Sequence, residues 1–194
     1  MMLLKNLEKY NIILASDSLR RQELLKELGL SFNVISSHAE ESFPEAFGMT
    51  AIPEYIARLK ASSVKDKMPE NYLLITADTI VWDDNKVLGK PVDREDAIST
   101  LESLSGSQHQ VITGMCIQTE KKEISFHAVT EVWFDNLTKE EIVYYVDKYK
   151  PYDKAGSYGI QEWIGYIGII KIEGSFYNVM GLPVHKLYQN LKKF

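Results

Sequence analysis

The sequence predicts an α/β fold in which a mixed sheet is flanked by helices. Apolar runs of strand length recur along the chain, segments with helical spacing lie between them, and two long apolar segments follow each other around a charged turn. This mixture of strands, helices and long hairpins is typical of α/β proteins with a mixed sheet. The chain has 194 residues, of which 45% are hydrophobic, and this suits one domain or two lobes that share a core.

The composition excludes several classes of protein. The net charge of −5 argues against a general nucleic-acid-binding surface but leaves room for a local basic site that binds a small anion. Cys116 is the single cysteine, and its apolar surroundings predict a buried, inert thiol in a reducing compartment. No apolar stretch is long enough to span a bilayer, and Lys5, Glu8 and Lys9 interrupt any signal-peptide core. We therefore expect a cytoplasmic protein with neither a membrane nor a nucleic acid polymer as partner. The oligomeric state stays open, although a homodimer would be ordinary at this size.

The first strand is expected at 12–15, and it leads through the polar turn 16–18 into a helix that ends at Gly29. The start of a helix has free backbone N–H groups and the positive end of the helix dipole, which together suit an anion. Arg20 and Arg21 lie in this first turn, where a phosphate ligand would explain two cations. The alternative is that both arginines are solvated surface residues and that the serine before them is simply an N-cap.

A second short strand is expected at 32–36, and an acidic loop follows it. Glu40 and Glu41 lie next to each other in this loop. Adjacent glutamates are usually solvated, and they are also the ligands that a hard divalent cation needs near a polyphosphate. The spacing alone favours the surface interpretation.

The next two elements carry further candidates. A helix is expected over 53–64, opened by its proline, with Arg58 and Lys60 off the apolar stripe and therefore either solvated or in contact with phosphate. The strand predicted at 72–82 carries Asp78 in its middle. A carboxylate is costly to bury there without a partner, so Asp78 is expected either at a strand end beside a cleft or paired with a cation.

The remaining elements follow from turn and cap signals. In chain order we expect a hairpin turn at 83–86, a constrained loop around Lys90, a helix at 94–105, strands at 111–119 and 124–134, a helix from the capping box at 138–141 to about 149, a loop at 151–161, a strand at 166–172, a turn at 173–175 and a last helix that starts at 181–183. His109 and His127 have no partners at metal-ligand spacing and are expected to be ordinary strand or loop residues. Asp153 and Lys154 could pair with each other in a loop of the kind that often carries function.

Several segments together resemble the Maf family of nucleoside triphosphate pyrophosphatases, from Ile12 to about Leu187. They are Ser16-Asp17-Ser18-Leu19-Arg20-Arg21, Ala57-Arg58-Leu59-Lys60-Ala61, Ala77-Asp78-Thr79, Gly89-Lys90-Pro91, Asp153-Lys154-Ala155-Gly156-Ser157-Tyr158-Gly159-Ile160-Gln161 and Val179-Met180-Gly181-Leu182-Pro183. Any one triplet would be weak, but their order and spacing along one chain make the match specific. There are two departures: Leu19 replaces the usual proline, and Glu162 follows Gln161 where glycine is common.

The resemblance implies a single domain over residues 1–194, with two lobes, a central nucleotide-binding cleft and a Maf/ITPase-like fold. It implies hydrolysis of a nucleoside triphosphate to the monophosphate and pyrophosphate with a divalent cation, Mg²⁺ or Mn²⁺. The loop that ends at Gln161 resembles the branch that acts on dTTP and UTP. Asp78 matches the catalytic proton acceptor. The matching substrate-binding positions are Ser16, Arg20, Arg21, Lys60, Thr79, Lys90 and Gln161, and the positions near the metal are Glu40 and Glu41.

The expected chemistry is attack of water between the α- and β-phosphates. Basic side chains and the metal would neutralise the triphosphate, and Asp78 would either take the proton of the water or hold the metal that acidifies it.

Three alternatives to this function stay open. The protein could be a nucleotide-binding regulator of cell division or repair that does not cleave its ligand. It could instead be an enzyme that clears modified nucleotides or, more distantly, a sugar-nucleotide or phosphomonoester hydrolase.

Overall fold

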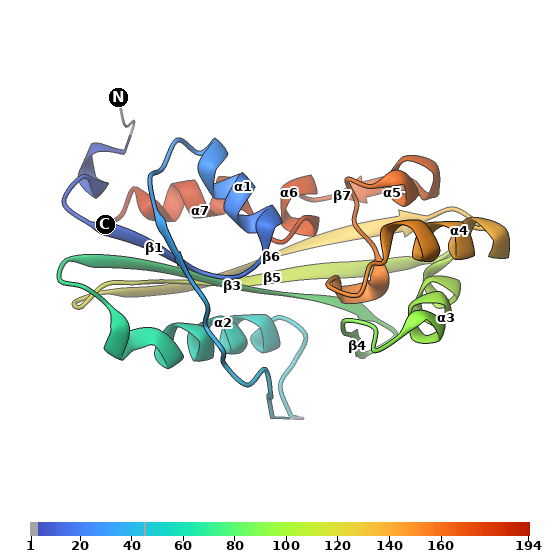
Figure 1. Ribbon diagram of the computed structural model, residues 1–194, viewed down its shortest axis with the longest axis horizontal. Coiled ribbons are helices and arrows are strands. Elements are labelled where there is room, and N and C mark those ends of the chain that lie inside the picture. Colours follow the sequence, from blue (N-terminus) through green and yellow to red (C-terminus); the bar gives the residue numbers. More distant parts are fainter. Residues whose placement is uncertain (1–3, 45) are drawn as a thin grey trace. The chain divides into compact units, whose positions relative to one another are not determined.

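The computed structural model describes residues 4–44 and 46–194 (Figure 1). The strands are β1 (Asn11–Ala15), β2 (Asn33–Ile35), β3 (Tyr72–Asp83), β4 (Lys86–Leu88), β5 (Gln108–Gln118), β6 (Glu123–Phe134) and β7 (Ile169–Glu173). The helices are α1 (Leu19–Glu27), α2 (Ala51–Val64), α3 (Arg94–Leu104), α4 (Lys139–Tyr149), α5 (Trp163–Gly168), α6 (Phe176–Val179) and α7 (Val184–Leu191), with short 3₁₀ turns at Lys5–Leu7, Lys65–Lys67 and Ala155–Ser157.

Within the described residues, the strands form one seven-stranded sheet. Its order is β2-β1-β3-β5-β6-β7, and β4 pairs with β3 outside this path. β1 pairs in parallel with both β2 and β3, whereas the β3–β4 and β6–β7 pairs are antiparallel. The sheet is therefore mixed and flanked by helices, which confirms the predicted α/β class.

The chain folds into two compact units. The first contains the residues up to Asp78 together with Thr113–Ala128 and Gly181–Phe194, and the second contains Thr79–Ile112 and Val129–Met180. Strands β3, β5 and β6 each contribute residues to both units. The arrangement as a single two-lobed domain around a nucleotide cleft stays a prediction.

In the first unit, β1 and the first half of β3 are apolar on both faces, as expected for strands that are covered on both sides. On one face, Ile13 and Leu74 pack against Ala57 and Ala61 of α2, and Cys116 lies in the same cluster. Helices α1 and α7 lie on the other side of these strands (Figure 1). Because every second side chain of a strand points to the same face, this alternation fixes the direction in which each polar residue of β3 points.

Helix α1 begins and ends as its sequence predicts. The Ser18 side chain accepts a hydrogen bond from the backbone N–H of Arg21 and so caps the helix start. Gly29 has a φ of +73° just after the last turn, a conformation that favours glycine. The polar turn before the helix is therefore a fixed feature, since its serine satisfies a helix N–H group.

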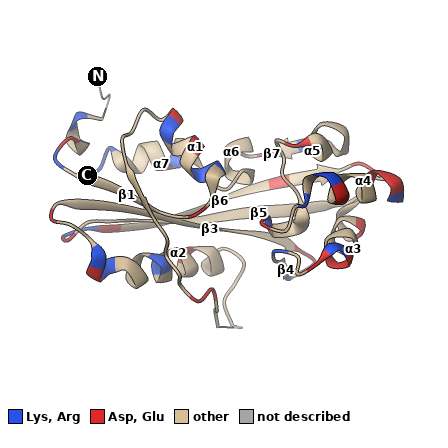
Figure 2. Cartoon of the chain, viewed as in Figure 1, with Lys and Arg blue, Asp and Glu red and all other residues tan. Residues whose placement is uncertain are grey.

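The second unit has its own core between helices and strands. Helices α3 and α4 contribute Leu101, Leu104, Ile142 and Val146, which pack with Val81, Val111, Val132 and Phe134 of the strands and with Tyr158, Ile160 and Ile164 of the following segment. Figure 2 shows basic and acidic residues along α3 and α4, and Arg94 and Asp147 link the two helices by a 2.6 Å ion pair. Asp93 caps α3, and Thr138 and Glu141 form the predicted capping box of α4.

The strand predicted at 166–172 is wrong over its first three residues. The segment expected as a strand at 166–172 instead begins within helix α5, and β7 starts only at Ile169. Ile164 is buried in the core of this unit, and a Cβ atom on Gly165 would lie 1.9 Å from the carbonyl oxygen of Ile160. Packing of this turn against the preceding segment therefore overrides the β-branched sequence that favours a strand.

Two further expectations concern α2 and Cys116. Helix α2 begins at Ala51 and not at Pro53, and the proline occupies a position in its first turn that tolerates a missing N–H.

Cys116 is buried as predicted, and burial raises the pKa of its thiol to about 12. None of the helices in the described ranges combines the length and the apolar character that crossing a bilayer requires.

Candidate active site

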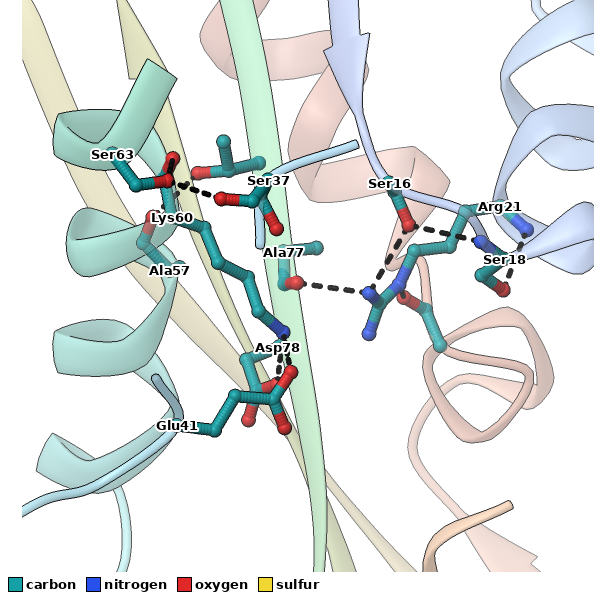
Figure 3. Close-up of polar contacts among 12 residues, drawn as sticks. Ser16, Ser18, Arg21, Ser37, Glu41, Ala57, Lys60, Ser63, Ala77 and Asp78 are labelled. Atoms are coloured by element: carbon teal, nitrogen blue, oxygen red, sulfur yellow. Dashed lines mark hydrogen bonds and ion pairs between the residues drawn. The ribbon is translucent and has the colours of Figure 1, made fainter. Parts of the chain in front are cut away.

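Three charged side chains of the first unit meet at the ammonium group of Lys60. The Nζ atom lies 2.7 Å from Oδ1 of Asp78 and 2.7 Å from Oε1 of Glu41 (Figure 3). Lys60 is 7% exposed and Asp78 is also 7% exposed, so their contact lies out of bulk water, whereas Glu41 is exposed. The buried carboxylate on β3 is thus paired with a cation, which is one of the two outcomes expected for Asp78.

The position of Lys60 corrects the prediction that it lies off the apolar stripe of α2. It shares the buried face of the helix with Ile56 and Ala57. Thr76 of β3 fixes this helix against the strand, because its hydroxyl donates a 2.6 Å hydrogen bond to the carbonyl of Ala57. Ala57 lies one helical turn before Lys60, and Thr76 lies two residues before Asp78 on the strand. This hydrogen bond therefore holds α2 and β3 together close to the ion pair. Arg58 is exposed, as the surface interpretation predicts.

Arg21 reaches from the start of α1 to two backbone carbonyls. Its Nε donates to the carbonyl of Gly181 and its Nη1 donates to the carbonyl of Ala77, both at 2.8 Å (Figure 3). Nη1 also lies 3.5 Å from the hydroxyl oxygen of Ser16. Since Ala77 directly precedes Asp78, this guanidinium fixes the backbone of β3 beside the buried carboxylate.

The electrostatics around Arg21 connect it to the same group of charges. Burial lowers the pKa of Arg21, and the negative charges of Asp78 and Glu41 oppose this effect. The positive charge of Arg20 acts in the same direction as burial. Figure 2 shows basic residues at the start of α1. Two arginines, one lysine and two carboxylates therefore influence one region of the first unit, where negative phosphate oxygens would complement the cations.

The acidic loop contributes one of its two glutamates to this group. Glu41 contacts Lys60, whereas Glu40 is exposed. The carboxylates of Asp78 and Glu41 supply hard oxygen atoms that converge on one cation, and such donors fit Mg²⁺ or Mn²⁺. No group of three or more His, Cys, Asp and Glu side chains gathers at a metal site within the described part of the chain. The protein side of a metal site would draw on the carboxylates of Asp78 and Glu41, with substrate phosphates or water as further ligands.

The other predicted substrate-binding residues belong to the second unit. Thr79 follows Asp78 on β3 and is half-buried, and Lys90 is exposed in the segment after β4. Gln161 is half-buried, and its Oε1 atom is buried without a hydrogen-bond partner among the described residues. A buried acceptor without a protein partner is costly unless a water or a ligand satisfies it.

Sequence reasoning did not find the carbonyl partners of Arg21. Backbone atoms of Ala77 and Gly181 leave no side-chain signature, and Gly181 lies 160 residues away along the chain. Sequence reasoning also missed the hydrogen bond between the segment before the acidic loop and α2, in which the Ser63 hydroxyl donates to the carbonyl of Ser37 at 2.6 Å.

His109 and His127 lie in strands, as predicted. His109 contacts the Tyr158 hydroxyl, and His127 contacts Glu54.

Comparisons with known proteins find similar chains of nearly the same extent. A protein of Parabacteroides distasonis named dTTP/UTP pyrophosphatase is 57% identical over 193 residues, which cover 99% of this chain and 100% of the relative. A protein of Bacteroides thetaiotaomicron with the same name is 57% identical over 192 residues, with 98% and 100% covered. Among solved structures, the Staphylococcus aureus Ham1 protein has 16% identity and a TM-score of 0.45 over 64% of this chain and 71% of its own, and no function follows from so distant a likeness.

The family model for "Maf-like protein" matches residues 11–194, almost the whole length of the chain. Its match spans the strand and turn before α1, the buried pair of Lys60 and Asp78, and the segment that ends at Gln161. Together with relatives that share more than half of their residues with it, this match establishes that the chain belongs to the Maf family.

Proposed function

We propose that this protein hydrolyses dTTP and UTP to the nucleoside monophosphate and pyrophosphate. The observation that carries the proposal is the buried carboxylate of Asp78, held 2.7 Å from the Lys60 ammonium in a group of basic and acidic side chains. Family membership and the names of full-length relatives at 57% identity support this choice of substrate.

Asp78 is proposed to accept the proton of the attacking water. Lys60 orients this carboxylate, and the bond from Arg21 to the carbonyl of Ala77 fixes the strand that carries it. Loss of a general base typically lowers the rate by a hundred- to ten-thousand-fold. Asp78 also has the chemistry of a metal ligand.

The basic residues are proposed to neutralise the triphosphate. Arg20, Lys60 and Lys90 supply positive charge, and Ser16 supplies a hydroxyl close to Arg21. The contacts of Arg21 with two carbonyls favour a role in positioning the backbone as well as in supplying charge. Asp78 and Glu41 would hold a divalent cation, since Mg²⁺ is usually bound through one or two carboxylates plus substrate phosphates. When bound, this cation supplies Lewis-acid stabilisation of charge on the phosphate oxygens.

Gln161 and Thr79 are proposed to select the base. Thymine and uracil share an imide N–H at ring position 3, and the buried Oε1 of Gln161 is an acceptor without a partner among the described residues. An acceptor of this kind favours uracil and thymine over cytosine, whose ring nitrogen at the same position carries no proton. A site built around such a hydrogen bond discriminates strongly against an analogue that cannot make it.

The cellular setting belongs to the same proposal. The buried, protonated thiol of Cys116 suits a reducing compartment, so the cytoplasm is the expected place of action. The proposed partners are nucleoside triphosphates, with neither a nucleic acid polymer nor a membrane. A homodimer is the assembly that size exclusion should test first.

Product analysis with the purified protein tests the proposal. We expect pyrophosphate and monophosphate from dTTP and UTP with Mg²⁺ or Mn²⁺, and a loss of activity of at least a hundredfold in Asp78→Asn. Asp84 is an exposed carboxylate in the turn after β3, so Asp84→Asn is the matched control and should leave the rate unchanged. Release of orthophosphate, or binding of dTTP without cleavage, would overturn the proposed reaction.

A further inference from the structure

The carboxylate of Glu162, the residue directly after Gln161, is held at both of its oxygen atoms. Oε1 lies 3.1 Å from the Nζ of Lys154, and Oε2 accepts a hydrogen bond from the hydroxyl of Tyr145. Lys154 is 8% exposed and Tyr145 is 0% exposed, so the carboxylate meets both partners away from bulk water. Charge-assisted contacts in such surroundings are strong and directional.

The hydroxyl of Tyr145 connects this carboxylate to the backbone of the preceding turn. Its oxygen atom accepts a 3.0 Å hydrogen bond from the N–H of Gly159. Burial, followed by the bond to Glu162, raises the pKa of Tyr145, so the hydroxyl stays protonated and its one proton is donated to Glu162. The Gly159 N–H therefore donates to the Tyr145 hydroxyl, and this hydroxyl in turn donates to the carboxylate of Glu162.

The side chains of Glu162 and Lys154 also fill the space above Gly159. A Cβ atom on Gly159 would lie 2.8 Å from the carboxyl carbon of Glu162 and 3.1 Å from Cε of Lys154. Carbon atoms in contact are normally about 3.5–4.0 Å apart, so only glycine fits beneath this network. The backbone N–H of Glu162 also donates to the carbonyl of Gly159 at 2.9 Å.

Gln161 lies inside the turn that these contacts close. Its own carbonyl accepts a 2.9 Å hydrogen bond from the hydroxyl of Tyr166. The backbone is thus held on both sides of Gln161, while the side-chain Oε1 is buried without a partner among the described residues. A fixed backbone with an unused acceptor is the arrangement that a group reading a ligand requires, because recognition depends on a supporting set of contacts.

We propose that Glu162 is a positioning residue for nucleotide selectivity: with Lys154 and Tyr145 it fixes the turn at 159–162 and so sets the direction of the Gln161 amide. This inference rests on the proposed function, in which Gln161 reads the pyrimidine base. A group that reads a ligand must be held within about 0.5 Å of its productive position by the residues around it. Glu162 therefore acts on the substrate through its neighbour.

The test compares Glu162→Gln and Tyr145→Phe with the wild-type protein. Glu162→Gln keeps the shape of the side chain and removes its charge, and Tyr145→Phe keeps the ring that stacks on Tyr149 and removes the hydroxyl. Glu140→Gln, an exposed glutamate on α4, is the matched control. The readouts are kcat and KM for dTTP and CTP, together with the dissociation constants of both nucleotides in an Asp78→Asn background.

We expect the preference for dTTP over CTP to fall by about tenfold in each variant, through KM and not through kcat. The double variant should lose no more than the larger single effect, because both changes open the same network. The control should keep the wild-type ratio.

An unchanged dTTP-to-CTP ratio in both variants, with stability lowered or not, would overturn the inference, since a purely structural role moves stability alone. Equal losses for both nucleotides would do the same. The wild-type protein separates this failure from that of the proposed function: if it releases no pyrophosphate, the reaction is wrong, and the ratio of dissociation constants still decides the role of Glu162.

Discussion

The ammonium of Lys60 and the carboxylate of Asp78 form a buried ion pair at 2.7 Å, although the two residues belong to different elements and lie 18 positions apart. Their burial means that each charge has lost most of its hydration, which the opposite charge compensates, and Glu41 is a second partner of the ammonium. The pair therefore serves both the fold of the first unit and the proposed reaction.

Replacing Lys60 with methionine should destabilise the protein because it leaves the Asp78 carboxylate buried without its cation. Breaking one side of a buried pair costs about 3–5 kcal/mol, so the free energy of unfolding in urea should fall by about that amount. Arg58→Met is the matched control on the same helix, since its contact with Glu123 is 3.6 Å long and both side chains are about half exposed. Such a surface pair contributes about 0–1 kcal/mol, and equal effects of the two changes would contradict the buried pairing.

Replacing Gln161 with methionine should alter nucleotide preference more than the maximal rate. The change keeps the length of the side chain and removes the acceptor that is proposed to meet the imide N–H of thymine and uracil. One lost hydrogen bond of about 1–1.5 kcal/mol corresponds to a rise of roughly tenfold in KM for dTTP and UTP. Steady-state kinetics over a panel of nucleotides measures this, with the exposed Gln108→Met as control. Unchanged selectivity would remove Gln161 from base recognition.

His109 should make stability depend on pH below neutrality. Burial lowers the pKa of His109 to about 4 from an ordinary value of 6.5, and its Nε2 contacts the hydroxyl of Tyr158 at 2.7 Å. The unfolded chain therefore binds a proton between pH 6.5 and 4 that the folded chain excludes, so this contribution is present above pH 6.5 and is lost as the pH falls through that range.

Urea unfolding at pH 7 and pH 5 measures this effect. The wild-type protein should lose about 2 kcal/mol more than His109→Gln between these two values, because glutamine can contact Tyr158 and does not titrate. His185→Gln, at an exposed position on α7, should behave like the wild type. A parallel loss in the wild type and His109→Gln would show that His109 is protonated or accessible in the folded state.

Gly114 should tolerate no larger residue. A Cβ atom at this position of β5 would lie 2.1 Å from the carbonyl carbon of Pro53 and 2.2 Å from the backbone nitrogen of Glu54, at the start of α2. Both are backbone atoms that cannot move aside, so Gly114→Ala should lower the free energy of unfolding by at least 1–3 kcal/mol. Gly48→Ala is the matched control, because nothing lies within 4 Å of a Cβ atom there. Similar midpoints in urea for both variants would contradict this close approach.

The parts of the fold that local signals specify were predictable. Ser18, Asp93 and Thr138 cap their helices as expected, because an N-cap hydroxyl or carboxylate has a local target only a few residues away. The turn after β3 is also as predicted, with Asp84 and Asn85 at positive φ between paired strands. These features depend on three or four consecutive residues, which a sequence shows directly.

The parts that tertiary contacts specify were not predictable. The sequence just after Gly165 favours a strand, whereas the helix there depends on packing of Ile164 in the core and on the close approach of Gly165 to the carbonyl of Ile160. The sequence alone favours a solvated Lys60, whereas the fold places it beside Asp78. Lys154 pairs with Asp153, as its position in the sequence suggests, and also with Glu162, which the sequence does not indicate. The identity of candidate site residues followed from motifs, whereas their partners required coordinates.

The two carbonyl bonds of Arg21 have a consequence for how the protein matures during synthesis. One partner lies 56 residues downstream and the other lies 160 residues downstream. A chain that emerges from the ribosome from its N-terminus can close the bond to Ala77 early, but it must wait for Gly181 before the guanidinium is fully held. The contacts of Arg21 are therefore completed only after Gly181 has been synthesised, and a nascent chain that lacks Gly181 holds Arg21 by one of these two carbonyls.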